Sequence, residues 1–147
     1  MPDIVVRPAR RVDGAIWRDM RAALYGESPS LLAEIEDYFI GNSSIAAAFI
    51  AETGLPIGFV ELGLRNYAEG CNTSPVAYVE GLYVKTGHRR RKIGAALVQA
   101  AEDWAKDRGH KELASDTQLI NDESLAAHRA YGFSEVERII CFRKDLT

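Results

Sequence analysis

The chain has 147 residues, of which 47% are hydrophobic and 27% are charged, and its formal net charge is −3 at pH 7. This balance is typical of one globular domain, here 1–147, and a net negative charge argues against non-specific nucleic-acid binding. No stretch approaches the roughly 20 apolar residues that cross a bilayer, and no basic, apolar leader precedes the first strand. We therefore expect a cytoplasmic protein with no membrane contact, in which Cys71 and Cys141 are both reduced.

The N-terminal part is predicted to contain a strand at Ile4–Arg7 and two helices, at Asp13–Leu24 and Pro29–Ile40. Ser28 is expected to cap the second helix, with Pro29 at its first position. The later elements are expected in this order: a hairpin of Ile45–Glu52 and Ile57–Arg65, a polar loop at Asn66–Pro75, a strand at Val76–Val84, a helix at Lys92–Arg108, a strand at Leu113–Asp116, a helix at Glu123–Tyr131 and one or two strands within Phe133–Lys144. This order predicts a mixed α/β domain, with a right-handed parallel crossover between Val76 and Asp116.

The turn at residues 91–96 is the most informative segment of the chain. It follows a β-rich run and begins a helix, so its free N–H groups and positive dipole end favour an anion. Gly94 and Ala96 have no bulky side chain, so phosphate oxygens can approach the backbone there. The spacing matches neither G-x-G-x-x-G nor the Walker loop, so the turn by itself is a phosphate-site hypothesis, and simple helix-start packing is its alternative.

This strand, turn and helix resemble motif A of the GNAT superfamily of N-acetyltransferases, whose signature [Q/R]-x-x-G-x-[G/A] is matched by Arg91, Gly94 and Ala96. Asn121 and the Tyr131-Gly132-Phe133 run follow in the order of that superfamily. The resemblance implies a single GNAT-type α/β domain, whose mixed, mostly antiparallel sheet is splayed at a parallel pair and flanked by helices.

A narrower resemblance covers Thr73–Val84, Ala114–Asp116 and the segment from Gly132 to Arg138, which look like the aminoglycoside 6′-N-acetyltransferases of the short chromosomal type. It implies acetyl transfer from acetyl-CoA to a primary amine of a cationic aminosugar, in a homodimer. Antibiotic resistance is the associated biological role.

The family resemblance also implies which residues hold the acetyl donor. Backbone N–H groups at Leu82, Tyr83 and Val84 are expected to bind the thioester carbonyl and the pantetheine, where they stabilise charge on oxygen. Asn121 matches an asparagine that contacts the pantetheine arm or an ordered water. The pyrophosphate is expected on the following turn, with side-chain charge from its first two residues: Arg91, Lys92, Ile93, Gly94, Ala95 and Ala96.

Two carboxylates are candidates for the proton transfer that an ammonium acceptor requires. Asp116 is favoured as the contact to the reacting amine and Glu80 as a substrate anchor or water-mediated base, although the two roles are exchangeable. Glu80 on a solvent-facing strand position and Asp116 as a turn cap are the structural alternatives. His128 stands where many family members have a tyrosine that can protonate the leaving thiolate. His128 either takes that role or is a packed helix residue.

Tyr25 and Tyr67 are expected to wall the acceptor site, since aromatic faces stack on sugar rings and meet ammonium groups. Glu27, Glu69 and Asp122 are weaker candidates for added negative charge there. No metal site is expected, because the three histidines lack ligand spacing. The basic run from His88 to Lys92 fits the phosphates of coenzyme A better than a nucleic acid.

Other acceptors and one other class of function remain open. A polyamine, a small metabolite amine or a peptide amine is the alternative substrate within the same fold. A noncatalytic acetyl-CoA sensor that binds a protein partner is the rival from another class, and two acidic residues beside the turn favour the enzyme.

Overall fold

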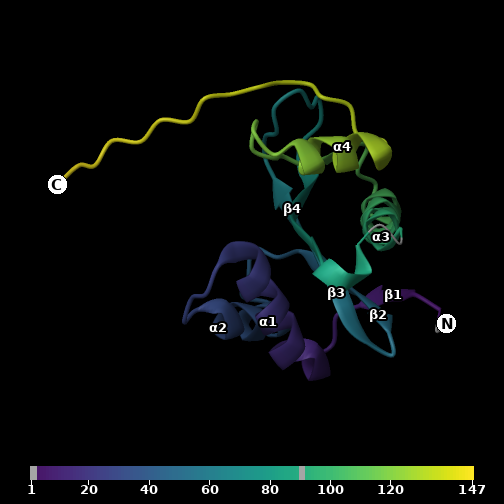
Figure 1. Cartoon of the computed structure of the whole chain (residues 1–147). Helices are drawn as coiled ribbons and strands as arrows, with labels where there is room; N and C mark the ends of the chain where they lie inside the picture. Colours follow the sequence, from purple (N-terminus) through teal and green to yellow (C-terminus); the bar gives the residue numbers. More distant parts are fainter. Residues whose placement is uncertain (1–2, 90–91) are drawn as a thin grey trace.

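A twisted sheet with strand order β1-β2-β3-β4-β5 organises the chain, whose computed structural model describes residues 3–89 and 92–147 (Figure 1). The first four strands pair antiparallel, and only β4 and β5 run parallel. The bounds are β1 Val5–Pro8, β2 Ala47–Thr53, β3 Leu55–Arg65, β4 Val76–Val84 and β5 Leu113–Ala114. The expected mixed, mostly antiparallel sheet with one parallel pair is therefore confirmed.

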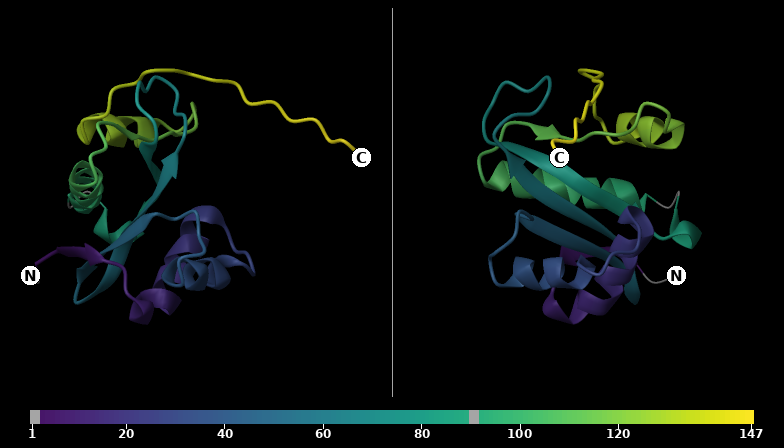
Figure 2. Two further views of the ribbon diagram at one scale, coloured as in Figure 1. Left: turned by 180° about the vertical axis from the view of Figure 1, so that it is seen from behind. Right: turned by 90° about the vertical axis from the view of Figure 1, so that its left-hand side faces the viewer.

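Helices cover both faces of this sheet, as the two turned views show (Figure 2). One face carries α1 and α2, which we call the front face, and the back face carries α3. The helices are the short 3-10 helix η1 at Arg11–Asp13, α1 at Gly14–Tyr25, α2 at Leu31–Phe39, the short η2 at Thr86–His88, α3 at Ile93–Asp107 and α4 at Asp122–Ala130. Within the described residues, none of these helices combines the length and apolarity that a bilayer crossing requires.

The second helix begins two residues later than the sequence suggests. Ser30, not Ser28, is the residue before its first turn, and Pro29 lies in the preceding turn. The hydroxyls of the two serines bond each other at 3.0 Å, and Ser30 Oγ also donates to Glu34 Oε1 at 2.7 Å. Serine side chains that bond locally in this way stabilise a turn as well as a cap, which is why the boundary moves.

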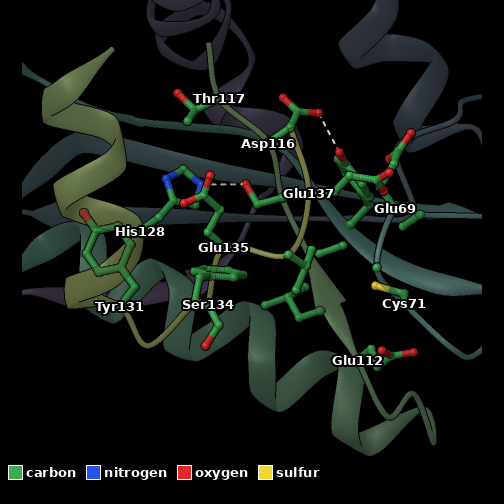
Figure 3. A pocket seen from close by; sticks show the side chains of 18 of the residues that line it. Glu69, Cys71, Glu112, Asp116, Thr117, His128, Tyr131, Ser134, Glu135 and Glu137 are labelled. Atoms are coloured by element: carbon green, nitrogen blue, oxygen red, sulfur yellow. Dashed lines mark hydrogen bonds between the residues drawn. The ribbon is translucent and has the colours of Figure 1, made fainter. Parts of the chain in front are cut away.

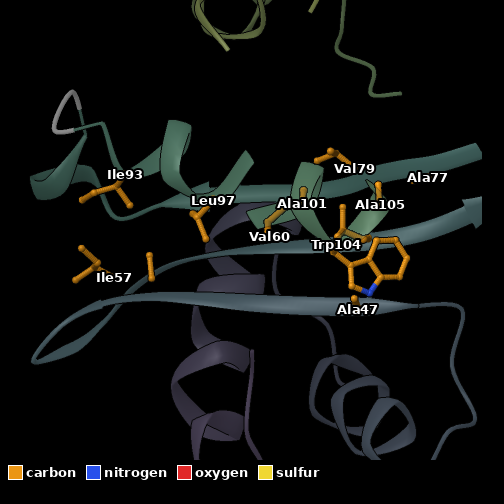
Figure 4. Packing of buried hydrophobic residues seen from close by; sticks show 12 residues of the cluster. Ala47, Ile57, Val60, Ala77, Val79, Ile93, Leu97, Ala101, Trp104 and Ala105 are labelled. Atoms are coloured by element: carbon orange, nitrogen blue, oxygen red, sulfur yellow. The ribbon is translucent and has the colours of Figure 1, made fainter. Parts of the chain in front are cut away.

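The back-face core fixes the position of α3 against the sheet (Figure 4). Ile93, Leu97, Ala101 and Trp104 lie along one side of α3 and pack on the strand residues below them. Leu97 is fully buried, and burial of such a side chain stabilises the fold by about 1.5–3 kcal/mol. The predicted helical spacing of this apolar face is confirmed, and it anchors the N-terminus of α3 beside β4.

An extra residue in β4 changes which side chains face the front. Gly81 pairs with Glu61, but the next pair joins Val79 to Leu62, so Glu80 has no partner of its own on β3. Such a bulge bends the strand and leaves two successive residues on one face. A Cβ placed on Gly81 meets Tyr25 of α1, and Glu80 lies over Gly63 on the same face.

The sheet opens on the other side of β4. The parallel ladder consists only of Ala77 with Leu113 and Tyr78 with Ala114. Among the described residues, no strand pairs with this edge of β4 beyond Tyr78. The strands therefore diverge, which leaves a cleft edge of free backbone between β4 and β5.

The predicted final strands at Phe133–Lys144 are wrong. Residues 133–147 all lie in the described part of the chain and contain no strand, and from about 139 onward the chain runs away from the domain (Figures 1 and 2). Their sequence is β-prone, but a strand needs a ladder partner, and this segment has none within its own chain. Ile140, Phe142 and Leu146 are consequently 80%, 92% and 89% exposed.

Candidate active site

The open edge of β4 presents backbone donors from Leu82 and Val84. Lys85 N donates to Ile57 O at 2.8 Å, across to β3. Counting back from Lys85, the backbone N–H groups of β4 therefore point alternately to the open edge and to β3. Tyr83 belongs to the β3-facing set, and its ring packs with Phe59 on the front face at 6.0 Å. Of the three predicted donors, alternation thus leaves the amides of Leu82 and Val84 for a ligand and commits that of Tyr83 to the sheet.

The N-terminus of α3 lies beside this edge, and its first turn is where the sequence predicts an anion site. Lys92 has a left-handed backbone, with φ of 62°, and helix geometry leaves the amides of Ile93, Gly94 and Ala95 without intrahelical acceptors. Ala96 N donates to Lys92 O at 3.1 Å, so its amide is already engaged, unlike the prediction. Arg91 lies outside the described residues.

Gly94 is required by a close neighbour as well as by its place in the turn. A Cβ on Gly94 comes 2.1 Å from the hydroxyl oxygen of Tyr131, which reaches across from the end of α4. Burial raises the pKa of Tyr131, so its hydroxyl keeps its proton at neutral pH. This contact joins α4 to the helix start, and the free amides beside it fit the diphosphate of a coenzyme A.

Glu80 lies on the front face and is held by Arg65, which sequence reasoning missed. Arg65 Nη2 and Nε donate to the two carboxylate oxygens of Glu80 at 2.6 and 2.9 Å. The carboxylate lies flat over Gly63, where a Cβ comes 2.8 Å from Glu80 Oε2. The Glu80 side chain is 33% exposed, so part of the carboxylate remains open to solvent.

Asp116 follows β5 and is tied to β4 through Tyr78. The Tyr78 hydroxyl donates to Asp116 Oδ2 at 2.5 Å (Figure 3). Burial, and then the Asp116 carboxylate, raise the pKa of Tyr78, which keeps it a donor. The guanidinium of Arg65 lies 3.5 Å above the Tyr78 ring, so one cation connects the surroundings of both predicted carboxylates.

Tyr25 joins the same face from the end of α1. Its hydroxyl donates to Glu61 Oε1 at 3.2 Å and lies against Gly81, where a Cβ is only 1.9 Å away. Burial raises the pKa of Tyr25, and the charges of Glu61 and Glu80 raise it further. Tyr25 therefore lies against β4 on the front face, and its role as a wall of the acceptor site stays a prediction.

A buried ionic network holds α1 in this position. Glu61, 2% exposed, accepts from Trp17 Nε1 at 2.9 Å and from Arg21 Nε at 2.7 Å. Arg21 continues to Leu31 O at 3.2 Å and Glu34 Oε2 at 2.8 Å, so one guanidinium links α1, α2 and β3. The network explains why Tyr25 reaches Gly81 with a fixed orientation.

His128 is engaged on both ring nitrogens. Nδ1 lies 2.7 Å from the carbonyl oxygen of Ser124, which only accepts, so Nδ1 carries the proton, and Nε2 then accepts from Ser115 Oγ at 2.8 Å (Figure 3). These bonds tie α4 to the chain after β5, and the ring also contacts Phe133 at 5.3 Å. The geometry favours the packing role of His128 over that of a proton donor.

The other predicted residues are placed less centrally. Asn121 caps α4, its carboxamide oxygen accepting from Ser124 N at 3.0 Å, which leaves only its amide group for a pantetheine. Tyr67 lies in the loop between β3 and β4, 69% exposed, and no described contact holds it against either carboxylate. Glu27 pairs with Arg18 on α1, away from the cleft. Asp122 lies in the first turn of α4.

A cavity of about 530 Å³ adjoins Asp116 (Figure 3). Its walls come from the loop around Glu69 and Cys71, from β5, from α4 and from residues 132–139. In the described part of the chain, no group of three or more His, Cys, Asp or Glu side chains is arranged to hold a metal ion.

The model of the acetyltransferase (GNAT) family matches residues 4–133. The chain belongs to the GNAT acetyltransferase family. The open edge of β4 and the N-terminus of α3 both lie within the matched residues. This chain is 45% identical to an aminoglycoside N(6′)-acetyltransferase type 1 of Klebsiella aerogenes over 97% of both chains. It is 35% identical to the enzyme of the same description from Stenotrophomonas maltophilia, over 96% of this chain and 93% of the relative.

Solved GNAT structures resemble the whole chain. One is aminoglycoside acetyltransferase AAC(6′)-Iy in complex with a bisubstrate analogue, CoA-S-monomethyl-acetylneamine, with a TM-score of 0.88 and 33% identity over 98% of this chain and 99% of the other. Another is AAC(6′)-Ih from Acinetobacter baumannii, with a TM-score of 0.87 and 32% identity over 99% and 100% of the two chains.

Three front-face residues were missed for different reasons. Tyr78 could have been found, because it lies two residues before Glu80 on the same strand face. Arg65 reaches Glu80 only through the register of β3 on β4, which the bulge displaces by one residue. Gly81 signals nothing by itself, since its role depends on where α1 places Tyr25.

Proposed function

We propose that this chain transfers the acetyl group of acetyl-CoA to the 6′-amine of aminoglycosides. The observation that carries the proposal is the front face itself, where Arg65 binds Glu80 and stacks on Tyr78, which donates to Asp116. A polycation with several ammonium groups finds two carboxylates and the Tyr25 ring there. The relatives named above point to the same substrate class.

The chain's own residues have three tasks in this reaction. The acetyl donor supplies a thioester, whose C–S bond breaks as the N–C bond forms, and the leaving sulfur keeps the electron pair and takes up the second proton of the attacking nitrogen. The ammonium proton goes to Asp116, with Glu80 as the anchor of a second ammonium or as a base through water, and the two roles remain exchangeable. The amides of Leu82 and Val84 donate to the thioester oxygen, where negative charge develops.

The test is coenzyme A release by the purified protein with kanamycin-like acceptors, together with the mass of the product. We expect one acetyl group per drug at the 6′ position, and none on an analogue with a 6′-hydroxyl. Asp116→Asn should lower kcat about 10²–10⁴-fold. Asp107→Asn, at the exposed end of α3, is the matched control and should behave as wild type.

Each rival gives a different result in the same assay. If the protein acetylates a polyamine, a small metabolite amine or a peptide amine faster than the aminoglycoside, that amine is the acceptor. Binding of acetyl-CoA without turnover of any amine indicates the noncatalytic sensor. Neither result is compatible with the proposed substrate.

We further infer that two copies of the chain associate through residues 139–147. This segment carries Ile140, Phe142 and Leu146 almost fully exposed, and it extends beyond the reach of its own domain (Figure 1). The outer edge of β5 has no partner among the described strands, and the cavity beside it is partly apolar. A β-prone segment of a second copy fits that edge, since unpaired strand edges add a strand readily.

Sedimentation velocity tests the association at several protein concentrations. We expect a dimer for the full chain and a monomer for the variant Phe142→Asp. Val12→Asp, at an apolar residue of η1 that is 83% exposed, is the control and should remain dimeric. A monomeric full chain, or a dimeric Phe142→Asp variant, overturns this inference without touching the proposed chemistry.

A further inference from the structure

Arg65 is the last residue of β3, and it touches both halves of the acceptor face. It donates to Glu80 through two nitrogens, and its guanidinium stacks on the Tyr78 ring at 3.5 Å. Tyr78 in turn donates to Asp116. The two carboxylates therefore share one connection, although Glu80 lies on β4 and Asp116 follows β5, 36 positions later in the chain.

The contact to Glu80 fixes the direction of its carboxylate. A glutamate on a partly exposed strand position samples several rotamers, whereas two parallel N–H···O bonds hold the carboxylate in one plane. A carboxylate has about four acceptor positions, and Arg65 uses one on each oxygen. The remaining positions lie on the side away from Arg65, where an ammonium group can bind.

The contact to Tyr78 acts on Asp116. Tyr78 is only 3% exposed, and its hydroxyl donates to one oxygen of Asp116, which leaves the other oxygen for a substrate. The guanidinium over the ring restrains the phenol from the side that the cleft leaves open. Because Asp116 is exposed, the hydrogen bond from Tyr78 is the described contact that holds its carboxylate in place.

The charge of Arg65 limits what the face attracts. One cation between two carboxylates leaves one net negative charge among the three groups. A substrate with several ammonium groups is still attracted to the two carboxylates, and the arginine reduces the repulsion between them.

We infer that Arg65 is the positioning residue of the acceptor site: it orients Glu80 directly and Asp116 through Tyr78. The inference rests on the proposed function, because it concerns the two carboxylates of that reaction. It assigns no contact between Arg65 and the reacting atoms.

The experiment measures acceptor kinetics of Arg65→Gln and Arg65→Lys at saturating acetyl-CoA. We expect Arg65→Gln to lower kcat for the aminoglycoside about ten- to a hundredfold, the effect of misplaced groups at a reacting centre. KM should change less than kcat, because the lost cation also increases the attraction for a polycation. Arg65→Lys should restore part of kcat, since it returns the charge but not the planar, two-point contact.

Two readouts separate positioning from a merely structural role. The affinity for acetyl-CoA, measured by calorimetry, should stay within about twofold of wild type, because Arg65 lies apart from the α3 N-terminus. In a Glu80→Gln background, Arg65→Gln should have a much smaller effect, because the two residues act through one contact. Arg18→Gln, which removes a half-buried arginine paired with Asp19 and Glu27, is the matched control and should not change kcat.

The inference is overturned if Arg65→Gln leaves kcat within twofold of wild type. It is equally overturned if the effects of Arg65→Gln and Glu80→Gln multiply independently, or if acetyl-CoA affinity falls in parallel with kcat. A wild-type protein that acetylates no aminoglycoside contradicts the proposed function instead, and that result is seen before any variant is made.

Discussion

The substitution Glu61→Gln tests whether the buried ionic network, rather than apolar contact alone, fixes α1 on the sheet. Glu61 accepts four hydrogen bonds, from Trp17 Nε1 at 2.9 Å, Arg21 Nε at 2.7 Å, Arg21 Nη2 at 3.3 Å and the Tyr25 hydroxyl at 3.2 Å. A glutamine keeps the shape but turns one acceptor oxygen into an NH₂ group that faces N–H or O–H donors. It also removes the charge that balances a buried guanidinium.

Removal of one partner from a buried ion pair costs about 3–5 kcal/mol. Arg21 retains Glu34, so we expect the lower end, about 3 kcal/mol of the free energy of unfolding. Glu34→Gln is the matched control: it removes the other carboxylate of the same arginine, but Glu34 is 45% exposed, so the expected loss is about 0–1 kcal/mol.

Urea unfolding followed by tryptophan fluorescence measures both variants, since Trp17 donates directly to the altered group. All measurements need one protein concentration, because association couples to stability. A loss below about 1 kcal/mol for Glu61→Gln, or equal losses for the two variants, refutes the reasoning that the desolvated pair is the source of the stability.

Three further outcomes are expected. Gly81→Ala should lower kcat/KM for the acceptor about tenfold or more, because its Cβ meets the α1 tyrosine hydroxyl at 1.9 Å, whereas Gly87→Ala, with nothing within 4 Å, should not. Gly94→Ala should weaken acetyl-CoA binding measured by calorimetry, and Tyr131→Phe in the same chain should restore part of it, since the hydroxyl lies 2.1 Å from the new Cβ. A neighbouring arginine lowers the pKa of Asp13 below 3.8, so its stabilisation is complete above that pH and is lost as pH falls through the folded value. The difference in unfolding free energy between wild type and Asp13→Asn should therefore shrink as the pH falls from 6 to 3. A difference that stays constant contradicts this prediction.

The parts of the fold that local patterns determine were predictable. The strand Val76–Val84 was found with its exact bounds, because a mostly apolar run of β-prone residues has a clear boundary at each end. The helix after it was found within one residue at each end for a similar reason. These two elements carry the residues proposed to hold the acetyl donor, so the placement of that part of the cleft followed from the sequence.

The acceptor side depends on contacts between distant segments, and the sequence gives no periodic signal for them. Glu80 and Asp116 were recognised as carboxylates near the cleft, but Arg65 and Tyr78, which hold them, depend on strand register and on the bulge. The C-terminal segment failed for the opposite reason. Its local pattern is typical of a strand, yet among the described residues the segment pairs with no strand of its own domain.

The extra residue in β4 makes position 80 the one place where the strand can lose a residue without reversing its faces. With Glu80 removed, Gly81 still pairs with Glu61 and Val79 with Leu62, so regular alternation keeps Tyr78 at the front and Val79 toward α3. A deletion at a regularly paired position of the strand turns every residue beyond it to the opposite side. Loss of Glu80 is therefore expected to straighten β4 and remove one carboxylate, while the rest of the strand keeps its register on β3.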